Sequence, residues 1–324
     1  GNLGVDILGF SIMSNHLHVV VRNRPDIVAG WSDDEVARRW WNVFPKRKDR
    51  DGHAAEPTDA ELTMITADPE RLAEVRRRMS SLSWFMRCLV EPIARRANRE
   101  DKCTGCFVEG RFRCQPILDE AALVACLAYV DLNPIRAGIA ETPETSRFTS
   151  VFERIQALCE MNDRSPAAVL PIAVTNDLAV AAAESGAPES ASKNAPPASA
   201  QWLSPFELSA AAADQPVPAD RASNKGCLPM PFSEYLQLLD WTGREVRADK
   251  RGAIPADLAP VLERLQLSSE SWLNLVHDFR RKFRRAAGTP ESLRKEAQKR
   301  GCRKMQGIQH SRAIFDPPAM GSTA

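Results

Sequence analysis

His16 and His18 are the residues of this sequence best placed for chemistry, because only one residue separates them. Side chains two positions apart on a β-strand point to the same face, so both imidazoles would converge on one point. Two converging imidazoles provide half of a divalent-metal site. Leu17, between them, would point into a core. The alternative is a pair of ordinary strand histidines without a ligand, in a chain that has only five histidines.

Tyr129 and Asn133 form a second candidate group. Residues four apart on a helix share one face. A phenol acts as a nucleophile when a cation or a base is nearby, and an amide oxygen can serve as a third metal ligand. Tyr129 is one of only two tyrosines. The alternative is that Tyr129 is a half-buried core residue and that Asn133, before Pro134, ends a helix.

A β-hairpin should position the two histidines. Two β-rich runs, residues 5–13 and 17–22, flank the polar break Ser14-Asn15-His16. Such a pattern predicts a strand, a tight turn and a second strand. The histidine pair would therefore lie where the second strand begins.

A helix should position the tyrosine. Asp119 is a suitable N-cap for a helix over residues 121–132, and Gly138 is a suitable stop after it. The preceding segment, residues 103–118, has no helical pattern and is predicted to be strand-like or irregular.

Two further helices are predicted before this one. Ser32 begins a capping-box pattern, and a helix should follow it to about Val43. Asp68-Pro69 opens another, in which apolar residues recur every three or four positions. Pro92 lies inside that pattern and should kink or end the helix.

The composition is that of an ordinary globular chain of about two domains. There are 324 residues, 44% hydrophobic and 26% charged, and the formal net charge is +1. No apolar run is long enough to span a membrane, so no membrane association is expected. Eight cysteines are too few for a disulfide scaffold, which favours a cytoplasmic location.

The chain should divide into four parts. Residues 1–150 contain the candidate site. Residues 160–227 hold 18 Ala and 8 Pro but only four Lys and Arg, which predicts a disordered linker. Residues 228–315 read as a basic helical C-terminal module, and residues 316–324 as a disordered tail. In the module, a helix should open at Thr289-Pro290 and close at Gly301, and one apolar stripe should comprise Trp272, Leu275, Val276, Phe279 and Phe283.

Basic residues are concentrated in two places. Residues 276–312 have 12 Lys and Arg against three acidic residues, a net of +9, and residues 71–113 have a net of +6. Such runs are usually solvated helix faces, but they can also bind phosphates. The candidate DNA contacts are Arg22, Arg24, Arg76, Arg77, Arg87, Arg111, Arg113, Arg281, Arg284 and Arg285.

Two other patterns have an ordinary and a functional interpretation. Trp40, Trp41 and Trp84 could stack on unpaired bases, but tryptophans at helical spacing are more often core residues. Cys103 and Cys106 have the spacing of half a zinc site. Because no second pair of that spacing follows, free thiols are the simpler interpretation.

The two site motifs together resemble a known family. The run MSNHLHVVV, residues 13–21, resembles the histidine–hydrophobic–histidine strand of the single-tyrosine HUH transposases. The run YVDLNPIRAG, residues 129–138, looks like their tyrosine helix. Between them, GRFRCQ at 110–115 resembles a short strand of the family, and LDEAAL at 118–123 resembles the entry to the tyrosine helix. The most similar subgroup is the REP-associated tyrosine transposases, in which Asn stands four residues after the tyrosine, as Asn133 does.

The resemblance, which covers about residues 1–150, implies an α+β fold with a ferredoxin-like antiparallel sheet. The family has a strand and a helix before the hairpin, whereas this sequence starts at the hairpin, so an N-terminally truncated form is expected. It further implies that His16, His18 and Asn133 hold Mg²⁺ or Mn²⁺. Tyr129 would then attack single-stranded, hairpin-associated DNA, form a 5′-phosphotyrosine link and transfer the strand, as an enzyme of transposition and DNA recombination.

Other functions remain open at this point. A catalytically inactive or domesticated relative would bind DNA hairpins without turnover. A replication initiator or relaxase of the wider HUH group is less consistent with a single tyrosine in the YxxxN context. The protein could work as a monomer or a homodimer, in the cytoplasm and on the nucleoid when bound to DNA.

Overall fold

The computed structural model describes residues 1–162, 200–208, 216–246, 262, 265, 267–303 and 305–315. Within them the fold is α+β, with one two-stranded antiparallel sheet surrounded by helices. The elements are β1 (Val5–Ile12), β2 (Leu17–Asn23), α1 (Pro25–Gly30), α2 (Asp33–Val43), α3 (Asp59–Thr66), α4 (Pro69–Met79), α5 (Leu82–Glu100), α6 (Glu120–Asp131), α7 (Asn133–Arg136), η1 (Pro143–Thr145), α8 (Ser150–Asn162), α9 (Phe232–Val246), α11 (Ser269–His277), α12 (Phe279–Lys282), α13 (Pro290–Lys299) and α14 (Ile308–Phe315).

The predicted hairpin is confirmed. β1 pairs with β2 so that Ser11 lies opposite His18, and Met13 N donates to His16 O (2.9 Å) to close the turn. His16 is therefore the last turn residue and His18 lies within β2. The prediction for Leu17 was wrong: its side chain is 36% exposed, because no described helix covers the hairpin tip on that face.

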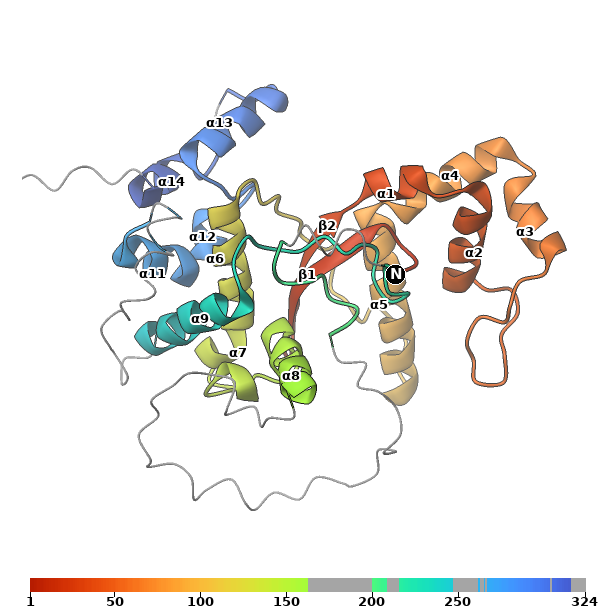
Figure 1. The fold of residues 1–324 in the computed structure, drawn as a ribbon, viewed down its shortest axis with the longest axis horizontal. Helices are drawn as coiled ribbons and strands as arrows, with labels where there is room; N and C mark the ends of the chain where they lie inside the picture. The colour runs from red at the N-terminus through yellow and green to blue at the C-terminus, as the bar shows by residue number, and fades with distance from the viewer. Residues whose placement is uncertain are drawn as a thin grey trace, which may run out of the picture.

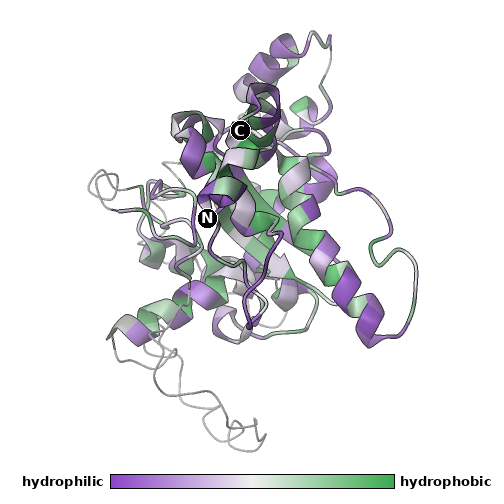
Figure 2. Cartoon of the chain, turned by 90° about the vertical axis from the view of Figure 1, so that its right-hand side faces the viewer, coloured by the Kyte–Doolittle hydropathy of each residue, from purple (hydrophilic) through white to green (hydrophobic). Residues whose placement is uncertain are grey.

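The hairpin lies between two groups of helices (Figure 1). On one side are α1 to α5, and on the other are α6, α9 and α11 to α14. α6 packs across both strands and α8 packs against β1. Figure 2 shows hydrophobic residues concentrated in the middle of the molecule, with hydrophilic stretches on the outer helices.

Three of the predicted helix starts are confirmed by their caps. The Ser32 hydroxyl accepts from Glu35 N at the start of α2, and the Asp119 carboxylate accepts from Ala122 N at the start of α6. Thr289 caps α13 in the same way, and α13 is followed by Gly301 at φ +63°. Side-chain oxygens satisfy backbone N–H groups that have no partner in the first helical turn.

The prediction of one continuous helix from Pro69 was wrong, and of the two alternatives predicted for Pro92, a kink or an end, the end was wrong. The helix breaks at Ser80-Ser81, between α4 and α5, where both residues leave helical geometry. Serine side chains compete for backbone hydrogen bonds, which favours caps over helix interiors. Pro92 does not end α5, which continues to Glu100. Proline removes only one helical N–H donor, and eight further residues, 93–100, extend the helix beyond it.

The prediction of disorder through residues 160–227 was wrong for the parts that the structure describes. Leu203 is buried and bridges to Ile7 on the free edge of β1, while Ser204 N donates to Ile7 O (2.9 Å). Ser223 donates to the buried carboxylate of Asp6 (2.8 Å). A few specific contacts thus hold a segment whose average composition is poor in core residues. Residues 163–199, 209–215 and the predicted tail 316–324 lie outside the described residues.

One hydrophobic core joins the early and late parts of the chain. It includes Leu8 of β1, Leu127 of α6, Tyr235 of α9, Trp272 of α11 and Phe283. Small residues on α6 allow neighbouring helices to approach closely, and these are Ala121, Ala122, Ala125 and Ala128. The predicted stripe that begins at Trp272 is confirmed as part of this core.

Residues 110–115, which resemble a strand of the transposase family, form no strand in the structure. Nearby, Ile117 makes an isolated bridge with Ala287, and Leu118 N donates to Ala287 O (2.8 Å). Residues 116–118 therefore join the late part of the chain to α6. Among the described residues, no helix has the length and apolarity needed to cross a membrane.

Candidate active site

The two histidine side chains lie next to each other at the tip of the hairpin. The ring centroids of His16 and His18 are 4.9 Å apart and the rings meet edge to face. His16 is exposed and His18 is partly buried. The i, i+2 spacing thus brings the imidazoles together, although the first of them belongs to the turn.

The tyrosine and the asparagine reach the same place from α6 and α7. The ring of Tyr129 lies 5.6 Å from the ring of His18. Asn133 Nδ2 lies 3.3 Å from His16 Nε2, across 117 positions of sequence. His16 therefore lies against both His18 and Asn133, and His18 lies against Tyr129, with the hairpin on one side and the junction of α6 and α7 on the other.

The nitrogen atoms of the two imidazoles are suited to a metal ion. His16 Nδ1 lies 2.7 Å from Asn15 Oδ1, and when Nδ1 donates this bond, Nε2 keeps its lone pair toward Asn133. His18 Nε2 is buried and has no hydrogen-bond partner among the described residues. A buried nitrogen without a partner is costly, and a metal ion would remove that cost. Imidazole nitrogens suit transition metals such as Zn²⁺, and an amide oxygen suits Mg²⁺ or Mn²⁺. In the structure it is the amide nitrogen of Asn133 that faces His16 Nε2, so its oxygen would have to turn toward such an ion.

Local electrostatics keep His18 neutral. Burial, followed by the positive charges of His16 and Arg280, lowers the pKa of His18 from 6.5 to about 4. Only the neutral imidazole can bind a metal ion. At neutral pH, His18 is therefore already in the form that the proposed site needs.

Tyr129 is held between two residues. Arg136 lies over its ring, 5.0 Å from the centroid, and the Phe279 ring lies 6.1 Å away on α12. Arg136 also donates to Val276 O (3.3 Å) and to His277 O at the end of α11. Burial lowers the pKa of Arg136. The C-terminal part of the chain thus contributes directly to the surroundings of the tyrosine.

The other tyrosine is not available for chemistry. Tyr235 is fully buried in α9, and its hydroxyl donates to Asp131 Oδ2 (2.7 Å). Burial and the Asp131 charge raise the pKa of Tyr235 well above 10. Tyr129 is therefore the one phenol of this chain that borders an open cleft.

That cleft has a volume of about 1380 Å³ and runs along the edge of β2 that pairs with no other described strand. His16, His18 and Tyr129 line it. Six arginines also line it, namely Arg22, Arg113, Arg136, Arg280, Arg281 and Arg284. A cleft with this many guanidinium groups attracts anions such as phosphates.

Two of the predicted DNA contacts belong to an internal ion pair. Arg22 Nη2 and Arg24 Nη1 lie 2.8 and 3.3 Å from the Asp6 carboxylate, which is completely buried. Arg22 also donates to Gly226 O (2.8 Å). These arginines join the hairpin to residues 223–226, so most of their donors are occupied.

Four more predicted contacts are paired on the helices. Arg76 pairs with Asp33 (2.7 Å) and also donates to two backbone carbonyls near α1. Arg77 pairs with Glu74 (2.7 Å), and Arg87 pairs with Glu91 (3.1 Å). Arg281 pairs with Asp278 (3.4 Å). Arg111 and Arg285 are exposed and lie outside the residues that line the cleft.

Asp131 is a functional residue that the sequence reasoning missed. Its buried carboxylate accepts from Ser150 Oγ (2.7 Å), Val151 N (3.1 Å) and Tyr235 OH (2.7 Å). It lies two positions after Tyr129 and fixes α6 against α8 and α9. An acidic residue at the end of a mainly apolar helix was the available signal.

The remaining candidates have ordinary structural roles. Trp41 is buried and donates to Ala55 O (2.6 Å), whereas the rings of Trp40 and Trp84 pack 5.8 Å apart. Cys103 and Cys106 are free and exposed. Among the described residues, no group of three or more His, Cys, Asp and Glu could hold a metal ion.

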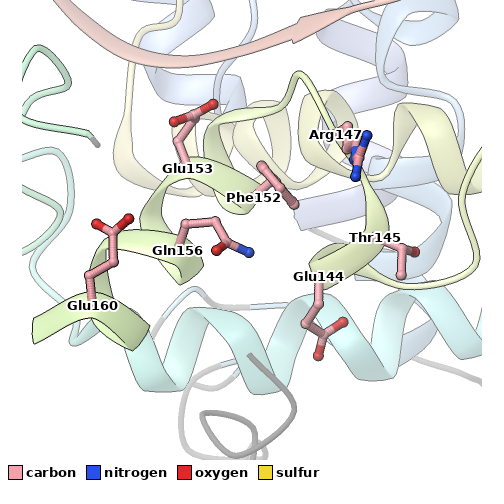
Figure 3. Close-up of a pocket in the computed structure, with 7 residues that line it drawn as sticks. All are labelled: Glu144, Thr145, Arg147, Phe152, Glu153, Gln156 and Glu160. Atoms are coloured by element: carbon pink, nitrogen blue, oxygen red, sulfur yellow. The ribbon is translucent and has the colours of Figure 1, made fainter. Parts of the chain in front are cut away.

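A second hollow, of about 590 Å³, lies beside η1 and α8, away from the histidines. Figure 3 shows the seven residues that line it. Glu144 and Glu153 point in opposite directions, so their carboxylates do not converge on one point. The hollow contains no nucleophile next to a base, and we assign it no role.

Comparisons of the chain with protein families, with curated proteins and with solved structures find no match.

Proposed function

We propose that this chain is a single-tyrosine DNA endonuclease and strand transferase of the transposase type. The observation that supports it most directly is the meeting of four residues from two distant motifs. His16, His18 and Tyr129 line a cleft together with six arginines, and Asn133 lies next to His16. The proposal includes the ferredoxin-like sheet that the resemblance implies, of which β1 and β2 would be two strands.

The reaction would begin with Tyr129. Its phenolic oxygen attacks the phosphorus of a phosphodiester in single-stranded or hairpin-associated DNA. The new O–P bond replaces the bond to the 3′ oxygen, which takes up a proton and leaves as a free 3′-OH. The phenol loses its proton to solvent or a nearby base. The product is a 5′-phosphotyrosine, and attack by another 3′-OH reverses the step and joins a different strand.

The surroundings of Tyr129 favour this step. Arg136 places a positive charge over the ring, where it would attract the negative charge of the scissile phosphate. Mg²⁺ or Mn²⁺ held by His16, His18 and Asn133 would neutralise charge on the scissile phosphate. His18 contributes a neutral imidazole, and Asn15 orients His16 by accepting from Nδ1.

The experiment is a search for a covalent adduct. The complete protein is incubated with Mn²⁺ and a hairpin-flanked single-stranded oligonucleotide, and products are separated on a denaturing gel. We expect a protein–DNA adduct that Tyr129→Phe abolishes. Tyr235→Phe is the matched control, because it removes the buried phenol and should leave the adduct.

His16→Ala should also abolish the adduct while DNA binding persists. Binding without any adduct in the unaltered protein would contradict the enzymatic proposal. It would favour the alternative of a hairpin-binding protein without turnover.

A further inference from the structure

Three arginines of the cleft differ from the others in having neither an acidic partner nor a hydrogen bond to a backbone carbonyl. Arg113, Arg280 and Arg284 are exposed, and no ion pair or hydrogen bond links their side chains to another group in the described part of the chain. The arginines of α4 and α5, by contrast, are largely paired with Glu74 and Glu91. An unpaired guanidinium keeps all its donors available for an external anion.

These arginines lie close to the catalytic group although they come from two distant segments. Arg280 directly follows Phe279, whose ring is 6.1 Å from that of Tyr129. α12, which contains both Phe279 and Arg280, packs against α6. Arg113 lines the same cleft from the segment that enters α6.

The two acidic residues of the cleft are already engaged. Asp278 lies 3.4 Å from Arg281 and 3.2 Å from His277. The Asp119 carboxylate accepts from the backbone N–H groups of Ala122 (3.1 Å) and Thr289 (2.6 Å). Neither carboxylate forms an ion pair with Arg113, Arg280 or Arg284.

We propose that Arg113, Arg280 and Arg284 bind backbone phosphates of the DNA strand beside the phosphate that Tyr129 attacks. The segment 277–284, far from the histidine and tyrosine motifs in sequence, is then part of the DNA-binding site. The choice of DNA as the occupant rests on the proposed function. A planar guanidinium matches two phosphate oxygens at once, which suits the sugar–phosphate backbone.

The opposite side of the cleft is compatible with the bases of such a strand. Leu82, Phe85 and Met86 of α5 line it, as does Phe112, which is exposed. Apolar and aromatic side chains stack on unpaired bases. Phosphates would lie toward the arginines, and bases would lie toward α5.

The test measures DNA binding without cleavage. The full chain with Tyr129→Phe is titrated with a fluorescent oligothymidylate in EDTA over a range of NaCl concentrations. Each phosphate contact on single strands contributes about 0.7 to the slope of log K against log salt. Arg280→Ala with Arg284→Ala should therefore reduce the slope by about 1.4 and weaken binding by roughly tenfold per arginine at low salt.

The matched control changes charge equally elsewhere in the same basic region. Arg294 and Arg303 are exposed and do not line the cleft, so their double alanine variant should keep the slope. Arg280→Lys with Arg284→Lys should keep it too, which provides a test if the alanine variant unfolds. An unchanged slope in the Arg280/Arg284 alanine variant, or an equal loss in the control, would overturn the proposal.

The outcomes separate this inference from the proposed function. If no adduct forms but the Arg280/Arg284 alanine variant has a smaller salt slope, the nuclease proposal fails and the proposed phosphate contacts remain. If the adduct forms and the salt slope of that variant is unchanged, the nuclease proposal remains and the proposal of phosphate contacts by these arginines is wrong.

Discussion

His18 illustrates how one residue can be prepared for a ligand by its surroundings. Its ring is partly covered by Tyr129 and lies against His16, and Arg280 adds positive charge nearby. Each of these makes protonation of His18 less favourable. The result is an imidazole that stays neutral and whose Nε2 has no partner among the described residues.

The same environment predicts a pH dependence of stability. The pKa of His18 is about 4 in the folded protein and 6.5 in an ordinary environment, so between these values the unfolded state binds more protons. The contribution of His18 to stability is complete above pH 6.5 and is lost as the pH falls toward 4. In EDTA, the melting temperature should therefore fall more between pH 7 and pH 5 in the unaltered protein than in His18→Gln. Equal falls in the two proteins would contradict this explanation.

The four candidate residues could be selected from sequence because the chemistry considered for them depends on spacing. The i, i+2 and i, i+4 relations place His16 beside His18, and Tyr129 on one face with Asn133. Which arginines are free depends instead on tertiary contacts. Glu74 precedes Arg78 by four positions, so that pairing was accessible from sequence, whereas the pairing of Arg22 with Asp6 needed the strand register.

At the scale of elements, Asp131 connects the tyrosine helix to α8 and α9. Asp131→Ala would remove the acceptor of three buried donors, namely Ser150 Oγ, Val151 N and Tyr235 OH. It should lower the free energy of unfolding by about 3–5 kcal/mol. Tyr235→Phe removes only one donor and should cost about 1–2 kcal/mol. Urea unfolding measures both, and a larger loss in Tyr235→Phe would contradict the central role of Asp131.

The end of α7 offers a cleaner test of backbone geometry. Gly138 has φ +69° and nothing within 4 Å of the position of an added Cβ, so Gly138→Ala acts through conformation alone. The substitution should cost about 1 kcal/mol. Gly110 is equally open but has no positive φ, and Gly110→Ala should be neutral within about 0.5 kcal/mol. Thermal unfolding of both variants tests this difference, and equal costs would refute it.

Local signals predicted elements well and tertiary contacts poorly. The starts of α2, α6 and α13 followed from single capping residues, because a cap acts over three positions. The attachment of Leu203 to β1 did not follow from an Ala- and Pro-rich composition. The contact depends on one β-bridge and on the burial of Leu203. The average composition of 68 residues does not reveal features of a single residue.

At the scale of the molecule, the core does not divide between the early and late regions. Leu127 of α6 and Trp272 of α11 belong to the same buried cluster. A fragment comprising residues 1–162 would expose the apolar side of α6 and should unfold without a cooperative transition. Circular dichroism during heating tests this, and a sharp transition in the fragment would show that the early region folds alone.

The contact between Tyr129 and Phe279 also has a consequence during protein synthesis. Their positions differ by 150 residues, which a bacterial ribosome translates in roughly 8 to 30 seconds. Throughout that interval the growing polypeptide has made the tyrosine helix but not the residues that cover it. At that stage a holdase chaperone would bind the uncovered apolar side of α6 on the nascent chain. The chaperone would be released when the C-terminal residues cover that side and complete the cleft.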